Sequence, residues 1–250
     1  MTPARRTTAC NGFRNPPTSI QQCMSDLSNT NGLFSPLVER AIELAAEWHD
    51  RTYRKGSWRP PLLPPPDGEG APVPVMAHLA AVASTVQQAG WPDPVVAAAY
   101  LHDALEDRDR HGRRLGRETL QEAVGDEVTA LVDAVSETKR DASGSPRPWR
   151  ERKEEYVATI ETAPDGAVAI SLADKLHNLW SMNQSLDRGT NVFESGPNRT
   201  ALSAGPDEQL WFYRSVLSVA GQRSDDRLAR MHERLRREVE RFAEQTISRA

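Results

Sequence analysis

Two strongly apolar segments of this chain each lead directly into acidic side chains. Residues 95–101 read Val-Val-Ala-Ala-Ala-Tyr-Leu, and residues 102–107 continue as His-Asp-Ala-Leu-Glu-Asp. Residues 167–173 are similarly apolar, and Asp174 follows them. Such segments predict two helices that are buried in the core of a domain. Because an unpaired carboxylate is costly to bury, we expect these acidic groups to be paired, hydrogen-bonded or bound to a metal ion.

The other periodic segments of the chain also have the pattern of helices. The sequence contains no strand-like alternation of useful length, no internal repeat and no phosphate-loop glycine pattern. Proline or glycine residues lie at the ends of most of the apolar periodic segments, and Gly125 separates two of the shorter segments. Besides the two core segments, the predicted helices are 36–48, 75–89, 117–124, 126–137, 149–162, 206–221 and 225–248. The predicted fold class is therefore all-α.

Length and composition predict one folded domain with an N-terminal extension. A chain of 250 residues could form one or two domains, and we expect one, covering residues 34–250. Residues 1–33 are rich in Thr, Ser, Asn and Pro, so we expect them to be disordered, with Met24 as an alternative start of translation. Residues 60–74 are rich in proline and are expected to form a semi-rigid surface loop.

The charge balance and the cysteines argue against several classes of protein. The formal net charge of -4 disfavours a nucleic-acid partner bound through bulk phosphate neutralisation. No run approaches the roughly 18 apolar residues of a membrane span, and the N-terminus lacks the apolar core of a secretory signal. We therefore expect a cytoplasmic protein without a membrane partner, whose oligomeric state the sequence leaves open. The two cysteines, Cys10 and Cys23, predict neither a disulfide framework nor a zinc site.

The acidic segment 102–107 cannot complete a metal site by itself. His102 and Glu106 are four positions apart, as are Asp103 and Asp107. On a helix each pair would project from one face, and the two pairs would be offset by about 100°. Two adjacent ligands leave a metal ion under-coordinated, so further His or Asp ligands must come from distant parts of the chain.

His78 and Asp174 are the candidates for these distant ligands, and each has an ordinary alternative explanation. His78 lies near the start of a predicted helix, where a histidine is often satisfied by the backbone. Asp174 could instead form an ion pair with Lys175 or Arg188. Their positions on the most apolar predicted helices favour coordination, because charges are disfavoured there unless paired or coordinated.

Several short motifs resemble those of the HD-domain phosphohydrolases. Within that family, they are most similar to the RelA/SpoT-type and small stand-alone (p)ppGpp hydrolases. Each motif alone is weak, but their order and spacing over about residues 36–220 are specific. In chain order the matching features are His49 five residues before Arg54-Lys55, His78 near a helix start, His102-Asp103, Glu106-Asp107, and the Leu-Ala-Asp-Lys-Leu-His-Asn sequence of residues 172–178.

The resemblance implies a single all-helical HD domain of about eight to ten helices and one divalent ion, typically Mn²⁺. The four metal ligands that it implies are His78, His102, Asp103 and Asp174. Mixed imidazole and carboxylate ligands suit Mn, Fe, Co or Zn better than Ca. Glu106 and Asp107 would then orient water and move protons, although they could also be solvated residues at a helix end.

The resemblance also implies how a nucleotide substrate would bind. Arg54 and Lys55 match residues that flank the purine base, a role suited to a planar guanidinium and a long aliphatic stem, although both could be solvated loop cations. Further substrate contacts are implied for Asn178, Ser181 and Tyr213. Arg152 and Lys153 fall near a basic segment of the family that could meet phosphates.

The chain departs from the family in ways that bear on the substrate. Leu79 stands where the family usually has proline, Ile170-Ser171 stands where a lysine is usual, and residues 60–74 replace a shorter connection. The expected function is the removal of the 3′-pyrophosphate from guanosine alarmones. The alternatives are an HD phosphohydrolase for another nucleotide, such as an adenosine alarmone or NADPH, or a degenerate alarmone-binding, antitoxin-like protein.

Overall fold

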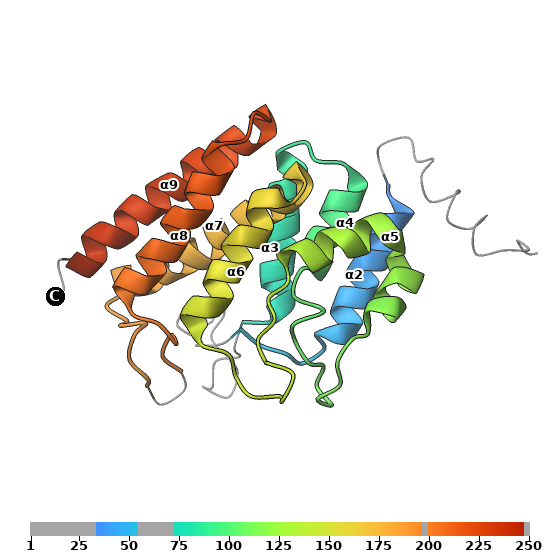
Figure 1. Ribbon diagram of the computed structural model, residues 1–250, viewed down its shortest axis with the longest axis horizontal. Helices are drawn as coiled ribbons and strands as arrows, with labels where there is room; N and C mark the ends of the chain where they lie inside the picture. Colours follow the sequence, from blue (N-terminus) through green and yellow to red (C-terminus); the bar gives the residue numbers. More distant parts are fainter. Residues whose placement is uncertain (1–33, 55–72, 197–199, 248–250) are drawn as a thin grey trace, which may run out of the picture. The chain divides into compact units, whose positions relative to one another are not determined.

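The described part of the chain is built from helices. The computed structural model describes residues 34–54, 73–196 and 200–247, and Figure 1 shows their arrangement. Within these ranges the extended contacts are isolated bridges, and no strand is formed. This confirms the predicted all-α fold class. The helices are α2 (Pro36–Trp48), α3 (Val75–Gln88), α4 (Asp93–Leu101), α5 (Arg117–Val135), α6 (Trp149–Thr162), α7 (Asp165–Asp187), α8 (Pro206–Gly221) and α9 (Asp226–Ile247).

The two apolar segments form the buried helices that the sequence predicts. Helix α7 packs against α3, α4, α5, α6, α8 and α9, and all residues from Gly166 to Lys175 are buried. In α4, Val95–Ala99 and Leu101 are buried. Burying a Val, Leu or Ile side chain contributes about 1.5–3 kcal/mol, and both helices bury several of them, so these two helices supply much of the stability of the core. Their charged continuations are consequently held inside the protein.

Close contact between α4 and α7 aligns the two charged segments. A Cβ atom built on Gly166, at the start of α7, would lie 2.9 Å from Cγ2 of Val95, at the start of α4. His102 and Asp174 come together at the other end of this pair, with Nε2 and Oδ1 3.7 Å apart. The two helices therefore run side by side in the same direction, and the absence of a side chain at residue 166 permits their close approach.

The acidic segment itself leaves the helix earlier than its spacing suggests. Helix α4 ends at Leu101, and residues 102–107 form successive turns instead of continuing the helix. The Asp107 amide donates to the Asp103 carbonyl at 2.9 Å, and the Ala104 amide donates to the Leu101 carbonyl at 2.9 Å. The expectation that residues 102–107 lie on a helix is therefore wrong. Their location at the C-terminal end of a core helix is confirmed.

Glycine and proline signals predict most helix boundaries to within one or two residues. Residue 125 has φ 83°, in the left-handed region that glycine adopts without strain, so α5 is kinked at the predicted junction of two shorter helices. Helices α6 and α8 have the predicted bounds. None of the helices in the described ranges has the length and apolar character needed to span a bilayer.

Several predictions fall outside the described residues. These are the N-terminal extension 1–33 with Met24 and both cysteines, Lys55, and most of the proline-rich loop. The described residues from Leu37 onward cluster as one compact unit. The proposed domain start at residue 34 stays a prediction.

Candidate metal and nucleotide site

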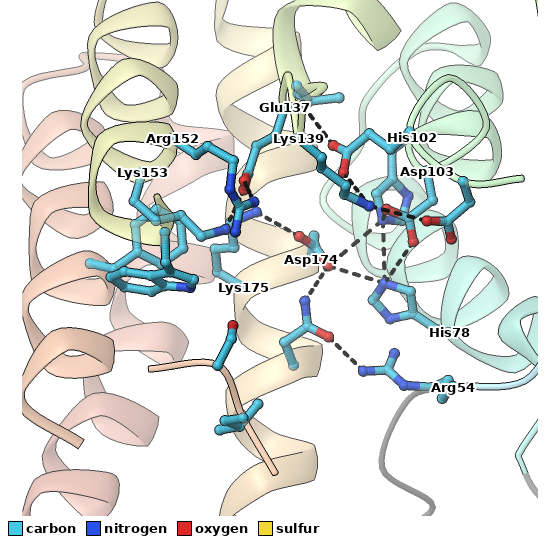
Figure 2. A pocket seen from close by; sticks show the side chains of 18 of the residues that line it. Arg54, His78, His102, Asp103, Glu137, Lys139, Arg152, Lys153, Asp174 and Lys175 are labelled. Atoms are coloured by element: carbon cyan, nitrogen blue, oxygen red, sulfur yellow. Dashed lines mark hydrogen bonds and ion pairs between the residues drawn. The ribbon is translucent and has the colours of Figure 1, made fainter. Parts of the chain in front are cut away.

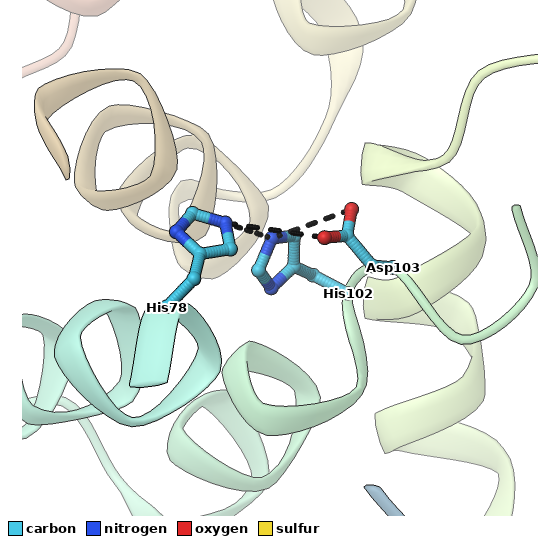
Figure 3. Close-up of side chains that lie close together, drawn as sticks. All are labelled: His78, His102 and Asp103. Carbon is cyan, nitrogen blue, oxygen red and sulfur yellow. Dashed lines mark hydrogen bonds and ion pairs between the residues drawn. The ribbon is translucent and has the colours of Figure 1, made fainter. Parts of the chain in front are cut away.

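Four side chains from three parts of the chain converge at the end of α4. His78 comes from the first turns of α3, His102 and Asp103 from the turns after α4, and Asp174 from the middle of α7. Figure 3 shows the two imidazole rings and the Asp103 carboxylate facing one another, and Figure 2 adds Asp174. Both histidines are buried, with 4% of their surface exposed. The structure thus brings together the four residues that the resemblance implies as ligands.

The distances between these groups suit a shared cation. Nε2 of His78 lies 3.3 Å from Nε2 of His102 and 3.0 Å from Oδ1 of Asp174. The Asp103 carboxylate lies 3.5 Å from Nε2 of His102 and 3.9 Å from Nε2 of His78. With bonds of about 2.1 Å, neighbouring ligands of one ion lie about 3 Å apart in octahedral and about 3.4 Å apart in tetrahedral geometry. His78, His102 and Asp103 therefore form a group that could hold a metal ion.

A hydrogen bond to the backbone determines which ring nitrogen of His102 faces the site. Nδ1 of His102 lies 2.8 Å from the carbonyl oxygen of Ala99, which can only accept a hydrogen bond. Nδ1 therefore carries a proton and donates, which leaves Nε2 as the atom that faces the two carboxylates and can take up either a proton or a metal ion. A backbone carbonyl in this position is a common way to orient a metal-binding histidine.

The charges of the cluster also favour a cation. Burial alone would lower the pKa of His102, but Asp103 and Asp174 outweigh it and raise the pKa to about 9. Burial alone would raise the pKa of Asp174, but Lys175 and the two histidines hold it well below the usual range. The metal-free cluster thus attracts a proton to His102. A divalent ion would replace that proton between the same atoms.

Asp174 has additional hydrogen-bond partners. Its Oδ2 accepts from Nζ of Lys175 at 2.7 Å, and its Oδ1 accepts from Nδ2 of Asn178 at 2.6 Å. The ion pair with Lys175, an alternative to coordination at the sequence level, is therefore formed together with the contact to His78. A carboxylate has two oxygens and about four acceptor positions, so both interactions are possible at once.

Glu106 and Asp107 are joined by a lysine that sequence reasoning missed. Nζ of Lys139 lies 2.9 Å from Oε2 of Glu106 and 3.1 Å from Oδ1 of Asp107. The other oxygen of Glu106 accepts from the amide of Glu137 at 2.7 Å. Burial raises the pKa of Glu106 despite the opposing charge of Lys139. A solvated helix end, the alternative for Glu106, is wrong, because the side chain is only 11% exposed and each of its two oxygens has a protein partner.

Basic residues form another wall of the site. The Glu137 carboxylate accepts from Nη1 of Arg152 at 2.7 Å and also pairs with Lys153. Nζ of Lys153 lies 4.4 Å from the centre of the Phe212 ring. Figure 2 shows Arg152, Lys153 and Lys175 on the side of Asp174 away from His78. We call Lys139, Arg152, Lys153 and Lys175 the basic wall.

Arg54 lies at the opposite side of the site. Its Nη2 donates to Oδ1 of Asn178 at 2.6 Å, and its Nη1 lies 3.2 Å from Nδ1 of His177. Figure 2 shows Arg54 below His78. The amide of Asn178 connects Arg54 to Asp174, because its Oδ1 accepts from Arg54 and its Nδ2 donates to Asp174. The candidate base-binding arginine is therefore joined to the candidate metal site by hydrogen bonds.

One cavity of about 370 Å³ is lined by the four candidate ligands, Glu106, Asp107, the basic wall, Arg54 and Asn178. This volume lies within the range of small-molecule sites. Among the residues that the resemblance implies for substrate binding, Arg54, Asn178 and Tyr213 line the cavity. Ser181 does not line it, and its buried hydroxyl has no hydrogen-bond partner among the described residues. Lys139, Glu137 and His177 are the members of the site that sequence reasoning missed.

The helical fold and the His-Asp group have a counterpart in a known family. Residues 64–195, more than half of the chain, match the HD domain family. The chain therefore belongs to the HD domain family, an assignment that confirms the resemblance read from its motifs.

Two proteins of similar sequence have names that refer to guanosine nucleotides. The chain is 30% identical over 152 residues to the mouse guanosine-3′,5′-bis(diphosphate) 3′-pyrophosphohydrolase MESH1, covering 60% of this chain and 71% of that protein. It is 31% identical over 146 residues to a probable GTP pyrophosphokinase of Mycobacterium leprae, covering 58% of this chain. The match spans only 16% of that longer protein.

Two solved structures share the fold. The lmo0812 protein of Listeria monocytogenes has a TM-score of 0.55 and 26% identity, over 68% of this chain and 97% of that one. A metazoan ortholog of SpoT described as hydrolysing ppGpp has a TM-score of 0.53 and 22% identity, over 85% of this chain and 96% of that one. At this identity the second similarity supports the fold alone.

Proposed function

We propose that this chain is a hydrolase that removes the 3′-pyrophosphate from guanosine alarmones, converting (p)ppGpp to GDP or GTP. The observation that carries the proposal is the meeting of His78, His102, Asp103 and Asp174 in one cavity with Glu106. The sequence similarity to a 3′-pyrophosphohydrolase over most of that protein's length supports the substrate class. We further propose Mn²⁺ as the ion and the cytoplasm as the location.

The four ligands suit an ion that acts on phosphate esters. When bound, a divalent ion would polarise a phosphoryl oxygen and lower the pKa of a nearby water molecule. Hydrolysis then requires that the oxygen of water attacks the phosphorus next to the ribose. The bond from that phosphorus to the ribose 3′ oxygen breaks, and pyrophosphate leaves.

Glu106 is our candidate for handling the proton of the attacking water. Its pKa, which burial raises, suits a group that takes up a proton from water and later gives it to the ribose oxygen. Lys139 and the Glu137 amide hold both carboxylate oxygens of Glu106, which orients the side chain. Asp107, which shares Lys139, would assist by keeping that lysine beside Glu106.

The two sides of the cavity suit the two parts of the substrate. The basic wall offers cations for the charged diphosphates. Arg54 and Asn178 lie on the other side, where a guanidinium plane and an amide suit a purine nucleoside. We also propose that Lys55 and Tyr213 contact the nucleotide. Ser181, which is buried away from the cavity, would contribute through packing.

The test is a substrate panel on metal-defined protein. The full chain is stripped with a chelator, reloaded with Mn²⁺ and incubated with ppGpp, and the products are separated by anion exchange. We expect GDP and pyrophosphate in equal amounts, and no product from Asp103→Asn. Cleavage of NADPH or an adenosine alarmone with ppGpp intact would move the proposal to another nucleotide. Nucleotide binding without any cleavage would indicate a binding protein.

A further inference from the structure

His177 contacts His78, one of the four candidate metal ligands, and has no role in the function proposed above. It follows Asp174 by three positions on α7 and precedes Asn178. Its Nδ1 lies 2.8 Å from Nδ1 of His78. The same atom lies 3.2 Å from Nη1 of Arg54. One nitrogen of His177 therefore faces two nitrogen atoms that could donate to it.

The chemistry of Arg54 fixes the direction of these hydrogen bonds. A guanidinium has only donors and stays charged in proteins, so Nη1 of Arg54 must donate. Nδ1 of His177 must then carry a lone pair. His78 can share the 2.8 Å contact with that lone pair only if its own Nδ1 carries the proton. His177 thereby draws the proton of His78 to the outer side of the ring, in competition with Oδ1 of Asp174, which lies 3.0 Å from Nε2 and can only accept.

The position of this proton determines whether Nε2 of His78 is available to a metal ion. A neutral imidazole with a proton on Nδ1 has a bare Nε2. Nε2 of His78 is the atom that lies 3.3 Å from Nε2 of His102 and 3.0 Å from Asp174. On the side of the ring that points away from the cluster, Nδ1 of His102 contacts a backbone carbonyl, whereas Nδ1 of His78 contacts the side chain of His177.

We infer that His177 is a positioning residue, which holds His78 in the tautomer and orientation needed to bind a metal ion. The inference rests on the metal site of the proposed function, but not on the identity of the substrate. The packing of the ring supports it: the centres of the His78 and His177 rings are 4.8 Å apart, and Trp180 lies 6.0 Å from His177 on the same helix. Loss of such an outer contact typically weakens metal binding by about 10–100-fold.

Three substitutions separate the hydrogen bond from the bulk of the ring. In His177→Asn the side-chain oxygen can occupy the position of Nδ1 and accept from His78. In His177→Gln the oxygen reaches the position of Nε2 instead, and His177→Phe keeps a ring without any acceptor. His111→Phe, in an exposed loop, is the matched control for the change from imidazole to phenyl.

The readout is the affinity of the metal-free full chain for Mn²⁺, followed by electron paramagnetic resonance of the free ion. We expect the dissociation constant to rise about 10–100-fold in His177→Phe, and to stay within about threefold of wild type in His177→Asn and His111→Phe. His177→Gln should resemble His177→Phe. Circular dichroism checks folding, and if His177→Phe does not fold, the difference between Asn and Gln decides.

Nitrogen-15 resonances of the histidines give a second readout that needs no metal. We expect the fraction of His78 that carries its proton on Nδ1 to be larger in the wild-type chain than in His177→Phe, where Asp174 is the remaining acceptor described for this ring. Equal Mn²⁺ affinities for wild type and His177→Phe, or an equal Nδ1-protonated fraction of His78 in the two chains, would overturn the role of His177. A wild-type chain that binds no Mn²⁺ would overturn it together with the metal site. If the variants behave as expected but ppGpp stays intact, only the proposed activity fails.

Discussion

Oδ1 of Asp174 lies 3.0 Å from Nε2 of His78, and Oδ2 of the same carboxylate accepts from Nζ of Lys175 at 2.7 Å. One aspartate thus faces the candidate metal site with one oxygen and compensates a buried lysine with the other. These two interactions have different consequences when the carboxylate is removed.

Asp174→Asn is expected to abolish Mn²⁺ binding and to lower the free energy of unfolding of the metal-free protein by about 3–5 kcal/mol. The loss of stability arises because Lys175 stays buried without its counter-ion. Urea unfolding of the metal-free protein measures the stability, and calorimetric titration measures the Mn²⁺ affinity.

The double variant Asp174→Asn, Lys175→Met separates the two effects. Removing the lysine charge should recover most of the lost stability, while Mn²⁺ binding stays absent. Recovery of Mn²⁺ binding in the double variant would show that Asp174 is not a ligand.

The affinity for Mn²⁺ should increase with pH up to about 9. His102 has a raised pKa of about 9, because Asp103 and Asp174 outweigh the effect of burial, so near neutral pH the metal-free protein holds a proton on His102. A metal ion must displace that proton, and the affinity should therefore fall about tenfold for each pH unit below 9.

Calorimetry at pH 7.5 in buffers of different ionisation enthalpy measures how many protons are released when Mn²⁺ binds. We expect close to one proton released for each Mn²⁺ bound. Metal binding without proton release would contradict the assignment of His102 as a ligand.

Glu106→Gln is expected to lower the turnover number by about 10²–10⁴-fold, because the amide cannot take up a proton from water. The Mn²⁺ affinity should change little, since Glu106 lies outside the group of four ligands. Glu122→Gln, on the exposed side of α5, provides the matched control. A Glu106→Gln chain with near wild-type turnover would exclude Glu106 as the proton acceptor.

Gly166→Ala should lower the free energy of unfolding by about 1–3 kcal/mol. The added Cβ would lie 2.9 Å from Val95 and would force α4 and α7 apart. Gly205→Ala is the comparison, because a Cβ there has no atom within 4 Å among the described residues. Since Gly205 is the N-cap of α8, where Ala is less favourable than Gly, we expect a smaller loss of about 0.5 kcal/mol. Equal urea midpoints for the two variants would contradict the tight packing of α4 on α7.

The sequence predicts the helices well because their boundaries depend on local chemistry. Pro164 before α7, Gly125 within α5 and Pro206 at the start of α8 act through their own backbone geometry. Residues 102–107 are the exception. Their spacing suits a helix, but the chain leaves the helix after Leu101 and forms turns there.

The candidate site could be predicted only in part, because much of it depends on contacts between distant segments. His102 and Asp103 stand out as charges after an apolar run. Lys139 has no such local signal, and it gains its role only where the loop after α5 meets Glu106. His177 lies within a recognisable motif, yet its importance depends on the tilt of its ring toward His78 on another helix.

The central claim is that His78, His102, Asp103 and Asp174 hold a divalent ion at which guanosine alarmones lose their 3′-pyrophosphate. The most direct measurement is the release of pyrophosphate from ppGpp by chelator-treated full chain, before and after Mn²⁺ is restored, beside Asp103→Asn. Activity that is absent without Mn²⁺, returns with it in the wild type, and stays absent in Asp103→Asn is the predicted result. Metal-loaded wild-type protein that leaves ppGpp intact, or equal activity of Asp103→Asn, would contradict the claim.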